Sequence, residues 1–177
     1  MRELRRPAPA YFFVAMLGQE NHLLSRAKDA LTAFFGPVEY ESDANPFFYT
    51  DYYEKELGKD LMRQFLFFSQ TRDPYEIVKA KIFTMQIEGS MGRGEGGRMV
   101  RQVNIDPGYL TQAKIVLASS KDFSHRIYLG RGVFAEVTLS FAEGSYRPHS
   151  YTFPEYSDEK NIALFNRMRE HNFTRKA

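Results

Sequence analysis

The densest run of polar side chains in this 177-residue sequence is K-D-F-S-H-R, at residues 121–126. It combines a carboxylate, an imidazole, a hydroxyl and two cations within a few positions. If Asp122 and His125 share a pocket, the carboxylate can orient the imidazole as a general base. Lys121 and Arg126 would then bind a phosphate or carboxylate group of the ligand. The run therefore predicts a catalytic pair, Asp122 and His125, beside two ligand-binding cations.

A structural interpretation of the same run stays open. The residues that follow it alternate between apolar and polar types, which predicts a β-hairpin around Gly130 and Gly132. A pairing that is symmetric about Arg131 places Arg126 opposite Glu136, so a cross-strand ion pair is an adequate explanation for both side chains. A lone histidine at the start of a strand is also more often structural than catalytic.

The segment N-I-D-P-G-Y-L, at residues 104–110, brings together a carboxylate, a proline and a glycine. We expect it at the junction of a strand and a helix, where ligands often bind. Asp106 can hold a metal ion or orient a substrate hydroxyl, the amides near Gly108 can receive an anion, and we place Tyr109 in the same site. The alternative is that Asp106 only caps a helix whose first residue is Pro107.

A third segment, T-D-Y-Y-E-K-E at residues 50–56, supplies a carboxylate and two adjacent tyrosines. Asp51 and Tyr52 are expected near the ligand. Alternatively, Asp51 interacts only with the dipole of a short helix that begins here. Together the three segments give one hypothesis, in which Asp106, Tyr109 and the run at 121–126 converge on one site.

The residue inventory excludes several kinds of chemistry. Cysteine is absent, which excludes disulfides, thiolate zinc sites and cysteine nucleophiles. The four histidines have no metal-ligand spacing, so no metal site is predicted. Glycines at 92, 94 and 97 match G-x-G-x-x-G, but they follow a predicted helix and precede a predicted strand, the reverse of the dinucleotide-binding context. We interpret this cluster as a connector, and the cofactor is unknown.

Hydrophobic periodicity and turn residues predict the elements that position these segments. In chain order, the first half predicts a strand at 11–17, a helix at 23–34, strands at 38–41 and 63–68, and a helix from 74 to about 87 that Asp73 caps and that turns Met85 inward. The second half predicts a strand at 99–105, a short helix from 106 to about 117, a hairpin of 127–129 with 133–141, a strand at 146–152, and a final helix capped by Ser157.

Strands in hairpins, with helices between some of them, predict an α+β fold with a mainly antiparallel or mixed sheet and helices packed on one side. The length and the 43% hydrophobic content are those of a single domain, spanning residues 1–177. The longest apolar stretch near the N-terminus, residues 11–17, is far shorter than the ~20 residues of a membrane span, and no secretory signal precedes it. We therefore expect a soluble, cytoplasmic protein with no membrane contact.

Several motifs in the sequence resemble those of a small family of bacterial and archaeal proteins of unknown function. They are F-G-P-V-E-Y-E-S at 35–42, F-x-x-T-D-Y-Y-E-K-E-x-G at 47–58, N-I-D-P-G-Y-L at 104–110, K-D-F-S-H-R-I-Y-L-G at 121–130, A-E-V-T-L at 135–139 and Y-T-F-P-E-Y at 151–156. Some members carry the label "GTP-binding protein". This sequence, however, has no phosphate loop, no D-x-x-G and no guanine-reading [NT]-K-x-D. The resemblance implies no established activity.

Two functions fit these observations. The first is binding, with or without catalytic turnover, of a small phosphorylated or otherwise anionic ligand such as a nucleotide. The second is a non-catalytic interaction or regulatory domain. The first requires the polar residues to line one pocket, whereas the second predicts that they pair with one another and leave an exposed apolar or aromatic patch. The net charge is only +2 and the basic residues are scattered, so nucleic-acid binding is least favoured.

Overall fold

The apolar run near the start of the chain forms β1 (Ala10–Gly18), the central strand of the main sheet. In the computed structural model, which describes residues 3–173, all nine residues of β1 are buried. β1 pairs antiparallel with β4 (Met62–Arg72) on one side and with β7 (Val103–Leu110) on the other. A strand that is covered on both faces needs apolar side chains at successive positions, so this run does not alternate with polar residues.

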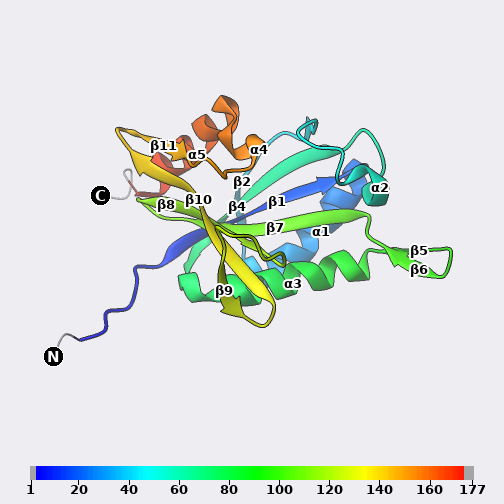
Figure 1. The fold of residues 1–177 in the computed structure, drawn as a ribbon, viewed down its shortest axis with the longest axis horizontal. Helices are drawn as coiled ribbons and strands as arrows, with labels where there is room; N and C mark the ends of the chain where they lie inside the picture. The colour runs from blue at the N-terminus through cyan, green and yellow to red at the C-terminus, as the bar shows by residue number, and fades with distance from the viewer. Residues whose placement is uncertain (1–2, 174–177) are drawn as a thin grey trace.

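The main sheet has nine strands in the order β11-β10-β8-β7-β1-β4-β2, with β3 attached to β4 and β9 attached to β10. Its remaining strands are β2 (Val38–Glu41), β3 (Asn45–Pro46), β8 (Lys114–Ser119), β9 (Ile127–Gly130), β10 (Val133–Ala142) and β11 (Ser145–Pro148). A separate hairpin of β5 (Arg93–Glu95) and β6 (Arg98–Val100) projects from one end of the molecule (Figure 1). The glycine cluster lies in this hairpin, where Gly96 and Gly97 adopt the positive φ angles of its turn.

Helices cover both faces of the main sheet (Figure 1). α1 (Asn21–Phe35) and α3 (Ile77–Ser90) pack on the face that includes Phe12 and Val14. α5 (Glu159–Phe173) packs on the opposite face, where the ring of Phe165 lies 5.1 Å from that of Phe13. The α+β fold with a large antiparallel sheet is thus confirmed. The helices lie on two sides rather than on one, because β1 presents apolar side chains to both faces.

The remaining helical segments are short. They are α2 (Glu54–Leu57), the 3-10 helix η1 (Pro74–Glu76) and α4 (Pro154–Ser157). Asp73 caps η1 as predicted, since its carboxylate accepts a hydrogen bond from the Tyr75 N–H at 2.9 Å. α5 is capped by Asp158 rather than by Ser157, because the Asp158 carboxylate accepts a hydrogen bond from the Lys160 N–H at 2.9 Å. Met85, predicted to face inward, is 45% exposed.

The helix predicted to begin at Asp106 and Pro107 is wrong, because these residues lie inside β7 and the segment after them forms β8. A proline is tolerated in a strand where one edge is unpaired, since it has no N–H to donate. β7 has such an edge at Pro107, because its pairing with β8 covers only residues 108–110 opposite 115–117. At the first paired position, Gly108, a Cβ atom would lie only 2.7 Å from the Val116 carbonyl oxygen.

Beyond this short ladder the sheet opens. Residues 103–107 of β7 have no partner on β8, whereas β8 continues alongside β10. Figure 1 shows β7 and β10 running apart from one another, with α3 beneath them. α3 contacts all three strands, so the opening is bounded by β7, β8 and this helix.

Candidate functional site: a cleft between two strands

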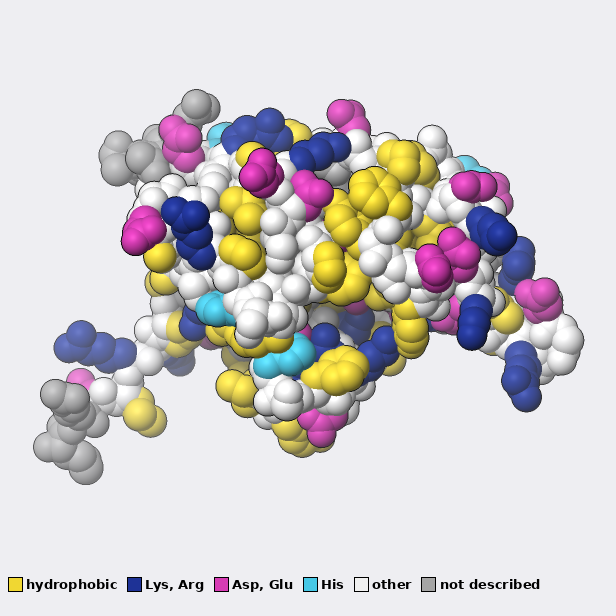
Figure 2. All heavy atoms as spheres, turned by 45° about the horizontal axis from the view of Figure 1, so that its top comes forward, with side chains coloured by type: hydrophobic (Ala, Val, Ile, Leu, Met, Phe, Trp, Pro, Cys, Tyr) yellow, Lys and Arg dark blue, Asp and Glu magenta, His cyan; other side chains and the backbone are white. Residues whose placement is uncertain are grey.

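The opening between β7 and β8 contains a cleft of about 730 Å³. Figure 2 shows a hollow on this side of the molecule, with Lys and Arg side chains inside it and hydrophobic side chains along its border. One side of the cleft is formed by α2, α3, β7 and the connection between β6 and β7. We call it the β7 wall; it comprises Glu56, Lys81, Glu88, Arg101, Asn104 and Asp106. We call the opposite side the β8 wall; it comprises Ser119, Lys121, Phe123, Arg126 and Glu136.

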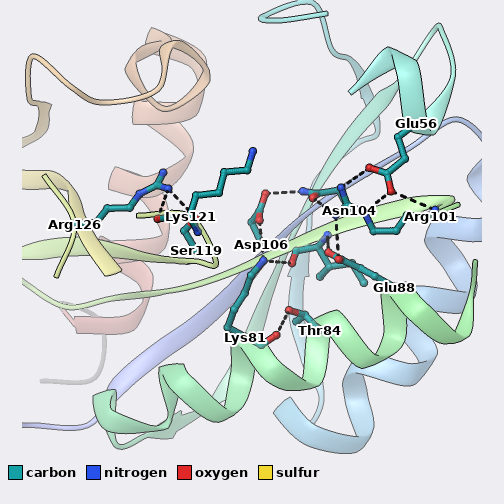
Figure 3. Close-up of polar contacts among 11 residues, drawn as sticks. Glu56, Lys81, Thr84, Glu88, Arg101, Asn104, Asp106, Ser119, Lys121 and Arg126 are labelled. Atoms are coloured by element: carbon teal, nitrogen blue, oxygen red, sulfur yellow. Dashed lines mark hydrogen bonds and ion pairs between the residues drawn. The ribbon is translucent and has the colours of Figure 1, made fainter. Parts of the chain in front are cut away.

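Arg101 is the centre of a hydrogen-bond network in the β7 wall (Figure 3). Its Nε and Nη2 donate to the two carboxylate oxygens of Glu56 at 2.8 and 2.6 Å. Its Nη1 donates to Glu88 at 3.1 Å and to the Asn104 side-chain oxygen at 3.0 Å. The guanidinium therefore joins α2, α3 and β7, and bidentate pairing fixes its orientation.

Asp106 lies at the other end of the same network. Its Oδ2 accepts a hydrogen bond from the Asn104 amide at 2.7 Å, and its Oδ1 accepts one from the Lys81 ammonium at 3.2 Å. Lys81 is 6% exposed, whereas the Asp106 side chain is 26% exposed. The carboxylate therefore faces the cleft, while the lysine that holds it lies beneath.

Two carboxyls of the β7 wall have pKa values that shift in opposite directions. Burial opposes the ionisation of Asp106, but the charges of Lys81 and Arg63, with hydrogen bonds from Lys81 and Asn104, lower its pKa below the ordinary 3.8. For Glu88, burial outweighs the attraction of Lys81, the hydrogen bond from the Ile105 N–H and the attraction of Arg101, and its pKa is raised above 4.5. Asp106 is therefore the more firmly ionised acceptor.

A buried ion pair between Arg63 and Glu155 also lines the cleft. The Arg63 Nε donates to the Glu155 Oε1 at 2.7 Å, and the two side chains are 7% and 1% exposed. The Arg63 Nη1 and the Glu155 Oε2 are buried and have no hydrogen-bond partner among the described residues. Each side chain thus keeps one buried polar atom without a partner among the described residues.

In the β8 wall, Arg126 is held from several directions. Its Nε donates to the Glu136 Oε2 at 2.7 Å, and its Nη1 donates to the Ser119 Oγ at 2.8 Å and to the Lys121 carbonyl at 3.0 Å. The cross-strand ion pair predicted from the hairpin is thus confirmed. Because Glu136 is buried and compensates the guanidinium, Arg126 has little charge left to offer a ligand.

Lys121 differs from the other cations of the cleft. Its ammonium nitrogen lies 3.9 Å from the centre of the Tyr52 ring. The carboxylates that line the cleft pair with other cations, and Lys121 forms no ion pair with any residue of the described range 3–173. Figure 3 shows its side chain extended between the two walls.

Aromatic side chains line much of the remaining surface. They are Tyr52, Tyr53, Phe123, Phe153 and Tyr156, accompanied by Met85 and Met99. Burial, together with the nearby charge of Asp106, raises the pKa of Tyr53 to about 12, so its phenol stays protonated at neutral pH. The cleft therefore offers apolar ring surface together with charged and hydrogen-bonding groups.

Half of the predicted site residues line the cleft. They are Tyr52, Asp106, Lys121 and Arg126. Asp51, Tyr109, Asp122 and His125 are not among the lining residues. Tyr109 packs on the other face of the sheet, 5.8 Å from the ring of Phe12. The cause is the strand: residues 106 and 109 would share one side of a helix, but in β7 they point to opposite faces.

His125 also has a different carboxylate neighbour from the one predicted. Its Nε2 lies 3.0 Å from the Glu136 Oε2, and within residues 3–173 it forms no hydrogen bond or ion pair with Asp122. The hairpin pairing brings Glu136 to this position, whereas Asp122 is exposed. The imidazole stacks on Tyr151 with a ring separation of 4.5 Å, so packing and Glu136 together fix its orientation.

Most residues of the β7 wall were not predicted from the sequence. Lys81, Thr84 and Glu88 are buried although they are polar, and they recur at helical spacing along α3. Polar residues on the inner side of a helix were the signal for a buried network. Arg63 and Glu155 gave no comparable signal, since they are 92 positions apart and meet only in the folded chain.

The fold and the cleft define an α+β protein with a candidate ligand-binding site between two diverging strands. The chain matches the family described as "Domain of unknown function (DUF4416)" over residues 8–172, and it belongs to this family. No curated protein and no solved structure is significantly similar to it. Within the described residues, no helix combines the length and apolar character needed to cross a membrane, and no group of three or more Asp, Glu and His side chains could hold a metal ion.

Proposed function

We propose that the cleft between β7 and β8 binds a small anionic ligand. The observation that carries this proposal is Lys121, a cation that extends into a cleft where the described carboxylates are already paired with other cations. Five Lys and Arg side chains line the cleft. Four of them pair with carboxylates, whereas the Lys121 ammonium forms no ion pair among the described residues. An anion near Lys121 would compensate that charge.

The size and rigidity of the cleft support the same proposal. Its volume of about 730 Å³ lies within the range of pockets that hold small molecules. The network around Arg101 fixes the side chains of the β7 wall before any ligand enters, which lowers the ordering cost of binding. The proposal is limited to binding, because Asp122 and His125, the predicted catalytic pair, do not line the cleft.

A thermal-shift screen tests this proposal. The compounds are inorganic phosphate, polyphosphate, sugar phosphates, nucleotides and coenzyme A. A ligand at about 100 times its dissociation constant stabilises the folded state by about 2.7 kcal/mol, which corresponds to a rise in Tm of roughly 5–10 °C for a chain of this length. We expect at least one compound to give such a rise in the wild-type protein.

Two matched variants connect any shift to the cleft. Lys121→Gln should remove most of the shift, because it deletes the unpaired charge. Lys160→Gln is the control, since Lys160 is an exposed lysine that lines a different cavity, beside α5, and it should keep the shift. A flat screen, or a shift that survives Lys121→Gln unchanged, contradicts the proposal.

One observation favours the second function, an interaction domain. β9 is an edge strand that pairs with β10, and its Ile127 and Tyr128 side chains are 71% and 59% exposed. Exposed apolar edge strands are typical sites for pairing with another chain. Analytical ultracentrifugation of the wild type and of Ile127→Lys tests this: if the edge supports self-association, the wild type sediments as an oligomer and the variant as a monomer. A monomeric wild type removes that support.

A further inference from the structure

The two walls of the cleft point to a ligand with two chemically different ends. We infer that the anionic ligand is a polyol phosphate, such as a sugar phosphate, whose anionic group lies at Lys121 and whose hydroxyl groups donate to Asp106. This inference rests on the proposed function, since it specifies the ligand of the same cleft. It is carried by the acceptor capacity that Asp106 keeps on the side facing the cleft.

Asp106 has unused acceptor positions. An ionised carboxylate can accept about four hydrogen bonds, and two of those positions are occupied by Asn104 and Lys81. The side chain is 26% exposed and lines the cleft, so the remaining positions are accessible to a ligand. Hydroxyl donors form charge-assisted hydrogen bonds to such an acceptor, which are stronger than bonds between neutral groups.

The orientation of this acceptor is fixed from behind. The Asn104 side-chain oxygen accepts a hydrogen bond from Arg101, which leaves its amide N–H group to donate to Asp106. Arg101 is itself held by both oxygens of Glu56. Recognition of a hydroxyl requires a partner in a defined position, and this chain of contacts provides one without the ligand.

The charges of the two walls determine which end of the ligand faces each wall. The three carboxylates of the β7 wall outnumber its two cations, Lys81 and Arg101, so this wall repels an anion, whereas Lys121 attracts one. A phosphate group therefore goes to the Lys121 side, and hydrogen-bond donors go to the Asp106 side. Inorganic phosphate would satisfy only the Lys121 side and would leave most of the 730 Å³ cleft unfilled.

The aromatic lining fits the body of such a ligand. Tyr52 and Tyr53 lie close to the two polar ends of the cleft, and Tyr52 contacts Lys121 directly. An aromatic face can pack against the C–H groups of a sugar ring or chain. The phenol of Tyr53, whose pKa burial raises to about 12, is both a donor and an acceptor for ligand oxygens.

Isothermal titration calorimetry with a ligand series tests the inference on the wild-type protein. The series contains ribose 5-phosphate, glycerol 3-phosphate, propyl phosphate, inorganic phosphate and ribonate. We expect ribose 5-phosphate to bind at least about tenfold more tightly than propyl phosphate, which has the same charge but no hydroxyl groups. Ribonate has hydroxyl groups but carries a carboxylate instead of a phosphate. Comparison of its affinity with that of ribose 5-phosphate therefore shows whether the anionic group must be a phosphate.

Two variants assign the contacts. Asp106→Asn should weaken ribose 5-phosphate about tenfold and leave inorganic phosphate unchanged or slightly tighter, because the substitution removes a repelling charge. Lys121→Gln should weaken both compounds. If Asp106→Asn does not fold, the comparison of ribose 5-phosphate with propyl phosphate on the wild type still decides the inference.

The outcomes separate this inference from the proposed function. Equal affinities for ribose 5-phosphate and propyl phosphate, or tighter binding of ribonate than of ribose 5-phosphate, overturn the polyol phosphate and leave anion binding standing. Absence of binding throughout the series overturns the polyol phosphate, while the wider thermal-shift screen then decides the fate of anion binding. A tenfold preference for ribose 5-phosphate that is lost in Asp106→Asn supports both.

Discussion

The β7 wall and the β8 wall face each other across one cleft, but they use their charges differently. In the β7 wall, the cations Lys81 and Arg101 pair with carboxylates, and Asn104 links Arg101 to Asp106. In the β8 wall, Arg126 is neutralised by Glu136, whereas the Lys121 ammonium lies over the ring of Tyr52 and forms no ion pair among the described residues. The β7 wall resembles a structural ion network, whereas the β8 wall keeps one charge available.

This difference follows from where each wall lies in the fold. Lys81 and Glu88 are buried on α3, where a charge without a partner would be costly. Lys121 lies in the loop between β8 and β9 and is exposed, so water can solvate its ammonium at little cost. Burial thus forces pairing in one wall and permits an unpaired cation in the other, which is the arrangement that ligand binding needs.

The largest expected effect concerns the centre of the β7 network. Arg101→Ala removes the partner of Glu56 and one partner of the buried Glu88. We expect a loss of about 2–4 kcal/mol in the free energy of unfolding, somewhat less than for a fully buried pair because Arg101 is 31% exposed. Urea unfolding measures it. Arg93→Ala, which breaks an exposed pair with Glu95, is the control and should cost less than about 1 kcal/mol. Equal costs for the two variants would show that the β7 wall is not structural.

The next effect concerns the point where the two walls separate. In Gly108→Ala, the new Cβ would lie 2.6 Å from the Phe13 ring and 2.7 Å from the Val116 carbonyl oxygen. The backbone pair of residue 108 with Leu117, where the pairing of β7 with β8 begins, must therefore shift. We expect a loss of about 1–3 kcal/mol, typical of overpacking. Gly94→Ala is the control, because a Cβ there meets nothing within 4 Å, and it should change stability by less than about 0.5 kcal/mol. An unchanged Gly108→Ala protein would contradict the close approach of the strands.

The β8 wall could be predicted better than the β7 wall, and the reason is sequence distance. The Arg126–Glu136 pair is ten positions apart and follows from hairpin register alone. Lys81 and Asp106 are 25 positions apart, and Arg63 and Glu155 are 92 apart. Those contacts depend on the order of the strands and on which face of the sheet each helix covers. Hydrophobic periodicity in the sequence predicts neither of these.

The fold was predictable for the same local reasons. The bounds of β2 agree with the predicted strand. The spacing of apolar residues predicts β1 and α1, and the glycines at 130 and 132 predict the turn of the β9–β10 hairpin. Asp106 and Pro107 mark the failure, because Asp-Pro is typical of both a helix start and a strand with one free edge. Only the pairing of β7 with β1 decides between them, and the misplacement of Tyr109 follows directly from that error.

A smaller effect separates the two carboxyls of the β7 wall by their response to pH. The folded-state pKa of Glu88 is raised above 4.5, so the folded protein binds the Glu88 proton more tightly than the unfolded chain does. This binding stabilises the fold fully below about pH 4.5, and the stabilisation is lost as the pH rises through the folded-state pKa. Asp106 acts in the opposite sense, since its lowered pKa gives stability above 3.8 that is lost as the pH falls. Glu88→Gln should therefore make the decline in stability above about pH 4.5 shallower.

Urea unfolding at a series of pH values measures this response. The decline should not vanish in Glu88→Gln, because burial also raises the pKa of Glu155. Acid destabilisation below about pH 4 should remain, since Asp106 is unchanged in the variant. Parallel pH profiles for the wild type and Glu88→Gln would mean that Glu88 does not hold its proton more firmly in the folded protein.

The smallest expected effect compares one lysine from each wall. Lys121→Gln should lower stability by less than about 1 kcal/mol, because it removes only an exposed contact with the Tyr52 ring. Lys81→Gln should cost more, about 1–3 kcal/mol, because it leaves Asp106 without its ammonium partner. Thermal and urea unfolding of both variants, without ligand, measure the difference. If Lys121→Gln costs as much as Lys81→Gln, both walls are structural, and the charge assigned to a ligand already serves the fold.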